Sequence, residues 1–336
     1  MISVGIIANP ESGKDIRRLV APASVFGNDE KVRMVRRALL GMDAAGVGRV
    51  WIMPDSYGIG HRALDGLRLR LEARLLEMPV RFTGEDSRLA AALMVERGAA
   101  CLLTLGGDGT NREVAKACGA VPLMPLSTGT NNVFPVTVEA TIAGLAAGLV
   151  ARGLADGAVS RVPRIDVFAC RNGAPPGPPA PDAAPDELAL IDAAADEDAF
   201  IGAGAIWDGA RVGELVLARA EPGSVGLSSI GAHLLGGAQP PGHGLYLRLA
   251  AGGRPVTAPI APGLIQTVHV AEYRLLAPGA AVAVGCGRPW VLALDGEREL
   301  ALRAGEVVWL RLNPAGPRVV DPRAAIALAA RAGAFG

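Results

Sequence analysis

The sequence has few aromatic residues and no net charge, and both features exclude classes of partner. Phenylalanine, tryptophan and tyrosine make up 4% of its 336 residues, which leaves little for stacking against nucleic-acid bases. The 33 lysines and arginines are balanced by 33 aspartates and glutamates, so no overall field attracts nucleic acid or an anionic membrane. We therefore expect no nucleic-acid partner.

Metal-binding patterns are also missing from the sequence. The four cysteines include no CxxC pair, and the four histidines have no ligand spacing. We interpret the cysteines as reduced thiols that pack as small hydrophobic side chains, and we expect no zinc site.

No hydrophobic run is long enough to cross a membrane, although the mean hydropathy is +0.32. The longest apolar run, residues 140–151, is well short of the roughly 20 residues that a spanning helix needs. The first residues, MISVGIIANP, lack a basic region and a small-residue cleavage site, so we interpret them as a strand. We expect a cytoplasmic protein with no integral membrane segment.

Residues 1–156 alternate β-like runs with helical patterns, which predicts an α/β domain. The pattern predicts strands at 2–8, 49–54, 99–105 and 121–126, and helices at 30–46, 61–76, 87–98 and 137–153. Asp86 or Ser87 is expected to cap the third of these helices. Strands that alternate with helices predict a parallel sheet covered on both faces, in a three-layer α/β/α arrangement.

Residues 157–320 have a different pattern, with short β-like runs between glycines and prolines. This spacing predicts a second domain that is antiparallel and β-sandwich-like. The Pro-rich, acidic stretch 173–187 is expected to form a mobile hairpin tip or loop within it. The last residues, 321–335, predict a helix with Asp321 as N-cap and Pro322 in its first turn.

The stretch LLTLGGDGTNREVAKA (102–117) contains the first candidate site. Glycines at the end of a buried strand let the backbone approach a ligand closely, and a helix that begins near Asn111 offers N–H groups to phosphate. Asp108 would repel a bare phosphate, so its carboxylate fits a magnesium site or a proton acceptor. The alternative is an ordinary strand-to-helix turn with Asp108 as a capping residue.

Two more polar loops follow predicted strands. NPESGK (9–14) offers donors toward phosphate oxygens, with an ordinary Asx/Pro turn as the alternative. PLSTGTNNVFP (125–135) surrounds Gly129 with neutral hydrogen-bonding side chains suited to a ribose, base or phosphate. Because the carboxyl ends of parallel strands meet at one edge of a sheet, we expect the three loops to converge there.

These motifs together resemble the NAD kinase/diacylglycerol kinase superfamily. The match rests on GGDGT, the NPxSGK turn and the Pro-x-x-Thr-Gly-Thr-Asn-Asn loop, and it covers essentially the whole chain. Within the superfamily the sequence is most similar to the acetoin-catabolism protein X (AcoX), ATP-NAD kinase-like group, through residues 25–41 and 127–135. The resemblance implies an N-terminal α/β domain on which the final helix, 321–336, packs back, and a C-terminal β-rich domain.

The resemblance also implies a reaction and its residues. The γ-phosphoryl group of ATP, bound with Mg²⁺, would pass to a hydroxyl of NAD or a related small-molecule acceptor, with Asp108 as the catalytic carboxylate. The residues expected to bind the nucleotide lie in the three loops: Asn9, Ser12, Gly13, Lys14, Gly106, Gly107, Gly109, Thr110, Asn111, Thr128, Gly129, Thr130, Asn131 and Asn132. A homo-oligomer is expected on the same ground.

A further motif lies in the second domain. Asp295-Gly296-Glu297 resembles the Asp-Gly-Glu turn of lipid-kinase relatives, which implies metal binding by Asp295 and a catalytic role for Glu297. The alternative is a plain β-hairpin, since Asp-Gly between two apolar runs is a strong hairpin pattern.

The match is incomplete where the acceptor should bind. The stretch nearest to the substrate loop of NAD kinases, residues 224–235, has serines but no tyrosine. His233 within it is interpreted as a helix-face or packed histidine, with a side chain that reaches the acceptor as the alternative. Two alternatives to an NAD-type kinase therefore stay open: a non-catalytic nucleotide-binding regulator of acetoin catabolism, and a lipid kinase of the diacylglycerol type.

Overall fold

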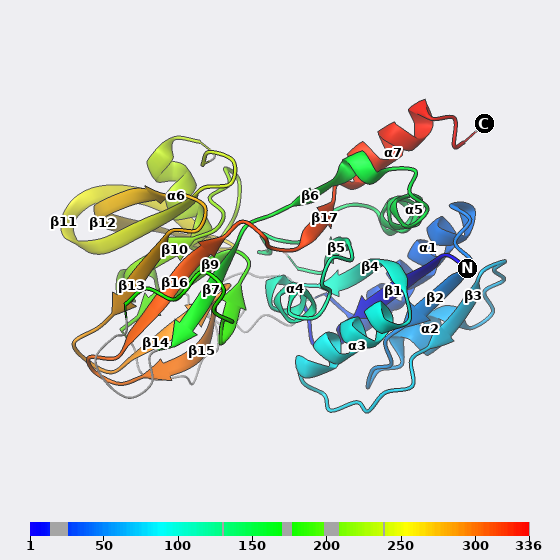
Figure 1. Ribbon diagram of the computed structural model, residues 1–336, viewed down its shortest axis with the longest axis horizontal. Helices are drawn as coiled ribbons and strands as arrows, with labels where there is room; N and C mark the ends of the chain where they lie inside the picture. Colours follow the sequence, from blue (N-terminus) through cyan, green and yellow to red (C-terminus); the bar gives the residue numbers. More distant parts are fainter. Residues whose placement is uncertain (14–25, 130, 170–176, 198–207, 238, 336) are drawn as a thin grey trace. The chain divides into compact units, whose positions relative to one another are not determined.

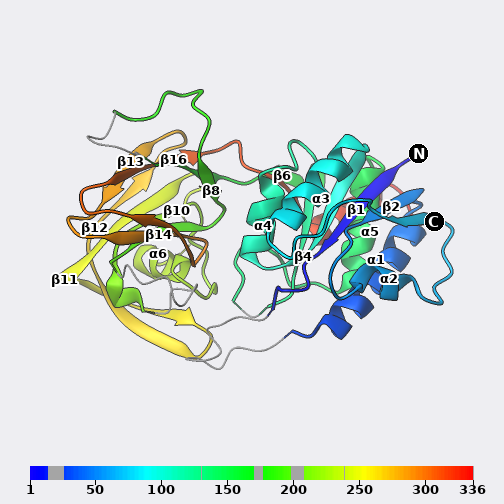
Figure 2. The ribbon, with the colours of Figure 1, turned by 90° about the horizontal axis from the view of Figure 1, so that it is seen from below.

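The computed structural model describes residues 1–13, 26–129, 131–169, 177–197, 208–237 and 239–335. The chain forms two compact units (Figures 1 and 2). The first contains the described residues of 1–162 and 317–335, and the second contains those of 163–316. Each unit has its own sheets and its own buried core.

The described part of the first unit is built on a seven-stranded sheet in the order β3-β2-β1-β4-β5-β17-β6. All neighbours pair in parallel except β17 and β6. The central strands are continuous apolar runs, as expected for strands buried on both faces. The strands are β1 (Ser3–Ala8), β2 (Arg49–Ile52), β3 (Glu72–Leu75), β4 (Ala99–Gly106), β5 (Leu123–Ser127), β6 (Val159–Arg161) and β17 (Arg318–Val320).

Helices cover both faces of this sheet, which confirms the three-layer α/β/α prediction. One core joins the sheet to α1 (Asn28–Ala44), α5 (Ala140–Ala151) and α7 (Pro322–Arg331). On the opposite face lies α3 (Glu85–Glu96), so close to β1 that a Cβ on Gly5 would lie 2.4 Å from the sulfur of Met94. The remaining helices are α2 (Ile59–Leu64) and α4 (Asp108–Ala115).

The described part of the second unit is a sandwich of two antiparallel sheets, which confirms the predicted fold class. Their strand orders are β12-β11-β10-β9-β14-β15 and β13-β16-β7-β8. One core contains residues from both sheets, and a second core lies between the larger sheet and α6 (Ser228–Leu235). The strands are β7 (Arg164–Ala169), β8 (Glu187–Ala189), β9 (Asp192–Asp196), β10 (Val212–Leu217), β11 (Gly244–Ala261), β12 (Leu264–Leu276), β13 (Ala281–Gly285), β14 (Trp290–Leu294), β15 (Glu297–Leu302) and β16 (Val307–Asn313).

The domain limits differ from those expected at 156/157 and 320/321. Strands β6 and β17 extend the sheet of the first unit, and Val319 of β17 pairs in parallel with Leu123 of β5. Because their backbone groups are satisfied inside that sheet, the chain crosses between the units at 162/163 and 316/317.

The helix predicted at 61–76 is wrong beyond its first turns. Helix α2 ends at Leu64, Gly66 has a positive φ of 64°, and the chain enters strand β3, which pairs with β2. The Asp43 carboxylate of α1 accepts hydrogen bonds from the amides of Arg70 and Leu71 at 2.8 Å each. Contacts between distant segments therefore override the local helical spacing.

The cap predicted for α3 is also wrong. The helix begins after Gly84, and no side chain caps it. Asp86 lies inside the first turn, and its carboxylate instead accepts hydrogen bonds from the amides of Arg81 and Phe82. Phe82 has a φ of 63°, and this carboxylate holds it in that conformation.

The final helix has the predicted start. The Asp321 carboxylate accepts hydrogen bonds from the amides of Arg323 (2.9 Å) and Ala324 (3.0 Å), with Pro322 in the first turn. Helix α7 packs on α5, and Ala325 and Ala329 are fully buried in the core of the first unit. None of the described helices is both long and apolar enough to cross a membrane.

The Pro-rich segment joins the antiparallel strands β7 and β8, but its described part is held in place. The Arg311 guanidinium donates to the carbonyl oxygens of Ala180, Pro181 and Ala183. Residues 173–176 lie outside the described residues. Arg311 also bonds the buried Asp166 carboxylate, so 180–183 is tied to the core of the sandwich.

The described cysteines are free thiols, Cys101, Cys118 and Cys286. Burial raises the pKa of the Cys101 thiol to about 12, so this group is protonated at neutral pH. It packs in the core of the first unit as a small hydrophobic side chain.

Candidate functional site

Three loops leave one edge of the sheet of the first unit. They follow the carboxyl ends of β1, β4 and β5, which are neighbours in the sheet. The first loop contains Asn9–Gly13, the second is the turn into α4, and the third runs from Thr128 to Phe134. Ligands of open α/β sheets bind at such an edge.

Side-chain hydrogen bonds tie the first loop to the other two. The Asn9 amide nitrogen donates to the Thr110 hydroxyl at 2.9 Å. The Thr128 hydroxyl donates to the Ser12 hydroxyl at 3.0 Å. Residues about 100 positions apart in the sequence are thus brought into direct contact, as the convergence of the three strands predicts.

Asp108 ties the second loop to the third. Its carboxylate accepts hydrogen bonds from the amide of Val133, at 3.1 Å to each oxygen, and from the amide of Phe134 at 2.8 Å. Phe134 itself is 2% exposed. Asp108 is the first residue of α4 and does not cap it, since the N-cap is Gly107 with no side-chain bond. This carboxylate therefore organises the third loop.

Gly107 of the second loop and Gly129 of the third leave space for the side chain of Asn132. A Cβ on Gly107 would lie 2.8 Å from the amide oxygen of Asn132, and a Cβ on Gly129 would lie 2.9 Å from its amide nitrogen. The Asn132 nitrogen donates to the Ser127 hydroxyl at 2.9 Å. Gly106 is constrained in a similar way, because a Cβ there would lie 2.5 Å from Thr110.

Asn111 lies beneath the loops. Its side chain is fully buried, accepts a hydrogen bond from Thr104 at 2.7 Å and donates to the carbonyl oxygen of Gly107 at 2.9 Å. Thr128 is also fully buried. Both residues were predicted to bind the nucleotide, and the polar atoms of their side chains bond to groups of the loops and of β4.

Gly109 and Asn131 are partly exposed at the surface of the loops. Lys14 and Thr130, the remaining two predicted nucleotide contacts, lie outside the described residues.

Lys31 was not among the site residues predicted from the sequence. Its side chain is fully buried, and its ammonium group donates to the carbonyl oxygens of Asn9 (2.9 Å), Pro10 (3.1 Å) and Ser12 (2.6 Å) and to the amide oxygen of Asn28 (2.9 Å). A pattern for it exists in the sequence. Position 31 is in helical phase with the buried residues Val35, Ala38 and Met42 of α1, so it lies on the apolar face.

The Asp-Gly-Glu motif forms a two-residue hairpin turn between β14 and β15, as the alternative reading predicted. Asp295 (φ 52°) and Gly296 (φ 75°) both have positive φ, as a type I′ turn requires. One carboxylate oxygen of Asp295 accepts hydrogen bonds from the amides of Leu190 (2.9 Å) and Ile191 (2.7 Å). Asp295 is 7% exposed and anchors the corner between β8 and β9, whereas Glu297 is exposed.

The acidic groups of the described residues form no cage for a metal ion. No group of three or more His, Cys, Asp or Glu side chains among them could hold one. Mg²⁺ in nucleotide sites is commonly bound through one or two carboxylates and the phosphates of the substrate.

The segment that corresponds to the acceptor loop forms α6. Ser228 and Ser229 are fully buried, and the Ser229 hydroxyl donates to the carbonyl oxygen of Gly226 at 2.6 Å. His233 is exposed, with Nδ1 2.7 Å from the carbonyl oxygen of Thr257 in β11. The histidine lies on the helix face, in agreement with its interpretation from the sequence.

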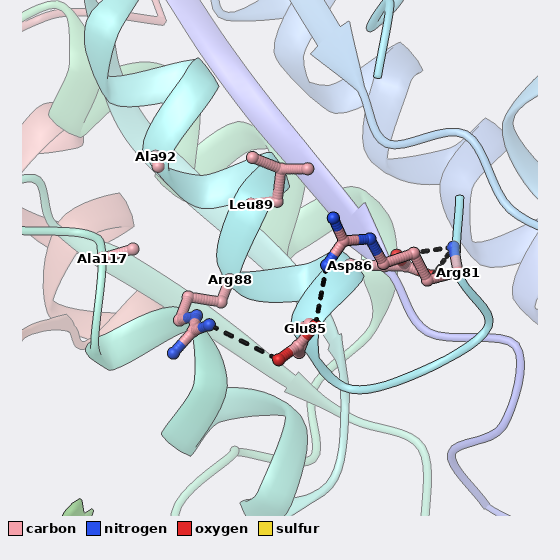
Figure 3. A pocket seen from close by; sticks show the side chains of 7 residues that line it. All are labelled: Arg81, Glu85, Asp86, Arg88, Leu89, Ala92 and Ala117. Atoms are coloured by element: carbon pink, nitrogen blue, oxygen red, sulfur yellow. Dashed lines mark hydrogen bonds and ion pairs between the residues drawn. The ribbon is translucent and has the colours of Figure 1, made fainter. Parts of the chain in front are cut away.

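A pocket of about 350 Å³ lies elsewhere in the first unit, on the surface of α3 (Figure 3). None of its lining residues belongs to the three loops. The charged side chains at its rim pair with each other: Glu85 lies 3.2 Å from Arg81 and 3.7 Å from Arg88. Asp86 is engaged with backbone amides. The two guanidinium groups of the pocket therefore share the one carboxylate of Glu85.

Comparisons with known proteins match both units. A family model for the ATP-NAD kinase N-terminal domain matches residues 4–154, and one for the acetoin catabolism protein X C-terminal domain matches residues 180–315. Acetoin catabolism protein X of Cupriavidus necator is 38% identical over 352 residues, covering 98% of this chain and 92% of that protein. A crystal structure of a proposed diacylglycerol kinase from Bacillus anthracis strain Sterne aligns with a TM-score of 0.45 and 14% identity, over 95% of this chain and 97% of that one.

Proposed function

This chain belongs to the acetoin catabolism protein X family and carries an NAD kinase-like N-terminal domain, and from that premise we propose that it is a small-molecule kinase. In this proposal ATP, bound with Mg²⁺, donates its γ-phosphoryl group to a hydroxyl of NAD or a related acceptor. The matched kinase domain, residues 4–154, contains all three loops at the sheet edge.

One observation carries the proposal: the three loops are joined to one another by the hydrogen bonds Asn9–Thr110, Ser12–Thr128 and Asp108–Phe134. Helix α4 starts there without a side-chain cap. The first N–H groups of a helix and the positive end of its dipole favour phosphate oxygens. We place the nucleotide phosphates at the start of α4.

The chain's residues divide into those that face a nucleotide and those that support the loops. The backbone of Gly107–Gly109 and the partly exposed Asn131 would contact it. Thr110, Asn111 and Thr128 would act indirectly, by holding the backbone in place. Phosphoryl transfer depends mainly on positioning and charge stabilisation, which such a rigid set of loops can supply.

We propose roles for the three carboxylates Asp108, Glu297 and Asp295, and that of Asp108 now includes holding the third loop. Asp108 would hold the third loop against the second and place a negative charge beside the phosphates, where bound Mg²⁺ would offset it. Glu297 is exposed and suits a proton acceptor, and Asp295 remains a proposed metal ligand. Mg²⁺, when bound, would neutralise charge that develops on the transferred group.

A second candidate function is a nucleotide-binding regulator without catalysis. The observation that favours it is that Asp108 and Asp295 both direct carboxylate oxygens at backbone amides. A carboxylate held in this way can organise a binding loop without taking part in a reaction.

The test combines ATP binding by calorimetry with ATP consumption in the presence of Mg²⁺ and NAD. It compares the wild type, Asp108→Asn and the control Asp65→Asn, an exposed residue of the same unit. An asparagine oxygen can still accept the bonds of Val133 and Phe134, so Asp108→Asn is expected to bind ATP but to lose turnover, about 100-fold or more. Asp65→Asn should match the wild type.

The outcomes separate the candidates. NAD-dependent ATP consumption that Asp108→Asn abolishes supports the kinase. Dinucleotide binding with no ATP consumption, for any acceptor offered, favours the regulator. Turnover only on diacylglycerol vesicles would assign a lipid kinase, and full activity of Asp108→Asn would remove that residue from the reaction.

A further inference from the structure

We propose that Lys31 is the positioning residue of the nucleotide site: its buried ammonium group sets the backbone of the Asn9–Gly13 loop in the orientation that binds phosphate. The inference rests on the proposed function insofar as it takes phosphate as the ligand. That Lys31 orders the loop rests only on its hydrogen bonds to the loop. Lys31 lies outside GGDGT, the NPxSGK turn and the third loop, although it falls within residues 25–41, which resemble the AcoX group.

The contacts of Lys31 are concentrated on one loop. Three of its four described acceptors are carbonyl oxygens of Asn9, Pro10 and Ser12, and the fourth is the side chain of Asn28 at the start of α1. An ammonium group has three protons, so these acceptors use its whole donor capacity. Lys31 is therefore saturated by the loop and is not itself a phosphate ligand.

The orientation of the carbonyl groups determines that of the amides. In a trans peptide the C=O and N–H bonds point in opposite directions. Because the carbonyl of Ser12 points at the ammonium group, the amide of Gly13 points away from it. The Ser12 hydroxyl bonds back to the carbonyl oxygen of Asn9 and accepts from Thr128, which fixes the same turn from its other side.

A charged group is needed at this position because the carbonyls converge. Three carbonyl oxygens that face one point repel one another unless a cation lies between them. With the cation removed, the buried oxygens would lose their partner and the peptide planes would turn toward water. The amide of Gly13 would turn with the carbonyl of Ser12, and its orientation toward phosphate would be lost although every loop residue is still present. The amides of Glu11 and Ser12 already donate within the loop, to the side chain and the carbonyl oxygen of Asn9.

The test is Lys31→Met, which keeps the length of the side chain and removes its charge. The matched control is Lys116→Met. Lys116 follows the C-terminal end of α4, away from the loops, and its ammonium group pairs with Glu113 of that helix. Hydrogen exchange of the amides of Asn9, Glu11, Ser12 and Gly13 is measured without nucleotide, and the affinity for ATP-Mg²⁺ is measured by calorimetry.

We expect Lys31→Met to exchange these four amides at least about tenfold faster, with the amides of β4 unchanged. We also expect it to bind ATP about tenfold more weakly, the smaller end of what the loss of an orienting residue causes. Lys116→Met should match the wild type in both measurements. If Lys31→Met does not fold, Lys31→Gln, which keeps a neutral donor, takes its place.

The two proposals fail in different ways. If the wild type binds no nucleotide, the proposed function fails, while the exchange measurement still tests the hold of Lys31 on the loop. If the wild type binds ATP and Lys31→Met binds it equally well, or exchanges its loop amides at the wild-type rate, the positioning role is overturned. Failure of both Lys31 variants to fold would also overturn it, since the residue would then support the whole core.

Discussion

Asp108 and Lys31 have complementary roles at the scale of single residues. The Asp108 carboxylate accepts hydrogen bonds from backbone amides of the third loop. The Lys31 ammonium group donates hydrogen bonds to backbone carbonyl oxygens of the first loop. Charged hydrogen bonds of this kind are stronger than neutral ones. Two ionic side chains from different elements thus shape the loops through the backbone.

A substitution at Gly13 can test how closely the first and third loops approach each other. It has a φ of 75°, and a Cβ there would lie 2.6 Å from the carbonyl oxygen of Thr128 and 2.7 Å from the Cβ of Phe26. We expect Gly13→Ala to lower the free energy of unfolding by about 2–4 kcal/mol, since strained φ and overpacking add. Urea denaturation measures this.

The control is Gly119→Ala, because Gly119 also has a positive φ (56°) but no atom within 4 Å of the new Cβ. Gly119→Ala should lower the free energy of unfolding only by the backbone strain, roughly 1 kcal/mol. Equal losses for the two variants would mean that the first and third loops move apart at no cost, against the close approach described here.

At the scale of elements, side chains set the ends of helices and hold the segments between them. Asp321 starts α7 by capping it, whereas Asp43 acts from the last turns of α1 on the segment that leads into β3. The segment before β3 has helical spacing in its sequence, but its amides at Arg70 and Leu71 bind Asp43 and are not part of a helix.

Asp43 should make the stability of the first unit depend on pH. Burial raises the pKa of this carboxyl group, but the amides of Leu71 and Arg70 and the Arg70 guanidinium together hold the pKa below its usual value. A lowered folded-state pKa stabilises the protein above the unfolded-state value, about 3.9, and the contribution is lost as the pH falls through the folded-state pKa.

We expect Asp43→Asn to be less stable than the wild type at pH 6, and the difference to shrink as the pH falls below about 4. Urea denaturation at pH 6, 4 and 3 measures it. Arg70→Met keeps the backbone donors and should show a weaker pH dependence. A difference for Asp43→Asn that stays constant over this range would contradict the assignment.

At the scale of the whole molecule, the described part of the second unit, within residues 163–316, is inserted in the sequence between two paired strands of the first unit. Strands β6 and β17 are antiparallel neighbours, with Arg161 opposite Arg318, and the amide of Val162 donates to the carbonyl oxygen of Pro317 at 3.1 Å. The chain therefore leaves the first unit and returns to it at adjacent points.

We expect the first unit to fold when residues 163–316 are replaced by Asn-Gly, a pair that favours a tight turn between antiparallel strands. Circular dichroism should show mixed α/β structure and a cooperative thermal transition, because the core that contains α1, α5 and α7 remains complete. A shortened chain without a cooperative transition would show that this core depends on the second unit.

Some features could be predicted from the sequence because local chemistry decides them. The apolar runs of β1, β4 and β5, the Asp321 cap and the Asp-Gly turn each depend on a few neighbouring residues. The convergence of the three loops follows from the parallel order of their strands. Resemblance to known kinases extended these patterns to the fold class of the whole chain.

Only the tertiary structure decided which polar groups bond within the fold and to which partners. The partners of Asp108, Asn111 and Lys31 come from segments that the sequence places up to 26 residues away, and those of Asp295 lie more than 100 residues away. The role of a buried charged group depends on the groups that the fold places around it, because the cost of its desolvation must be offset by partners at hydrogen-bond distance. The sequence by itself determined strands such as β1, β4 and β5 and the edge at which their loops meet, and the packing of the elements gave each charged group its role.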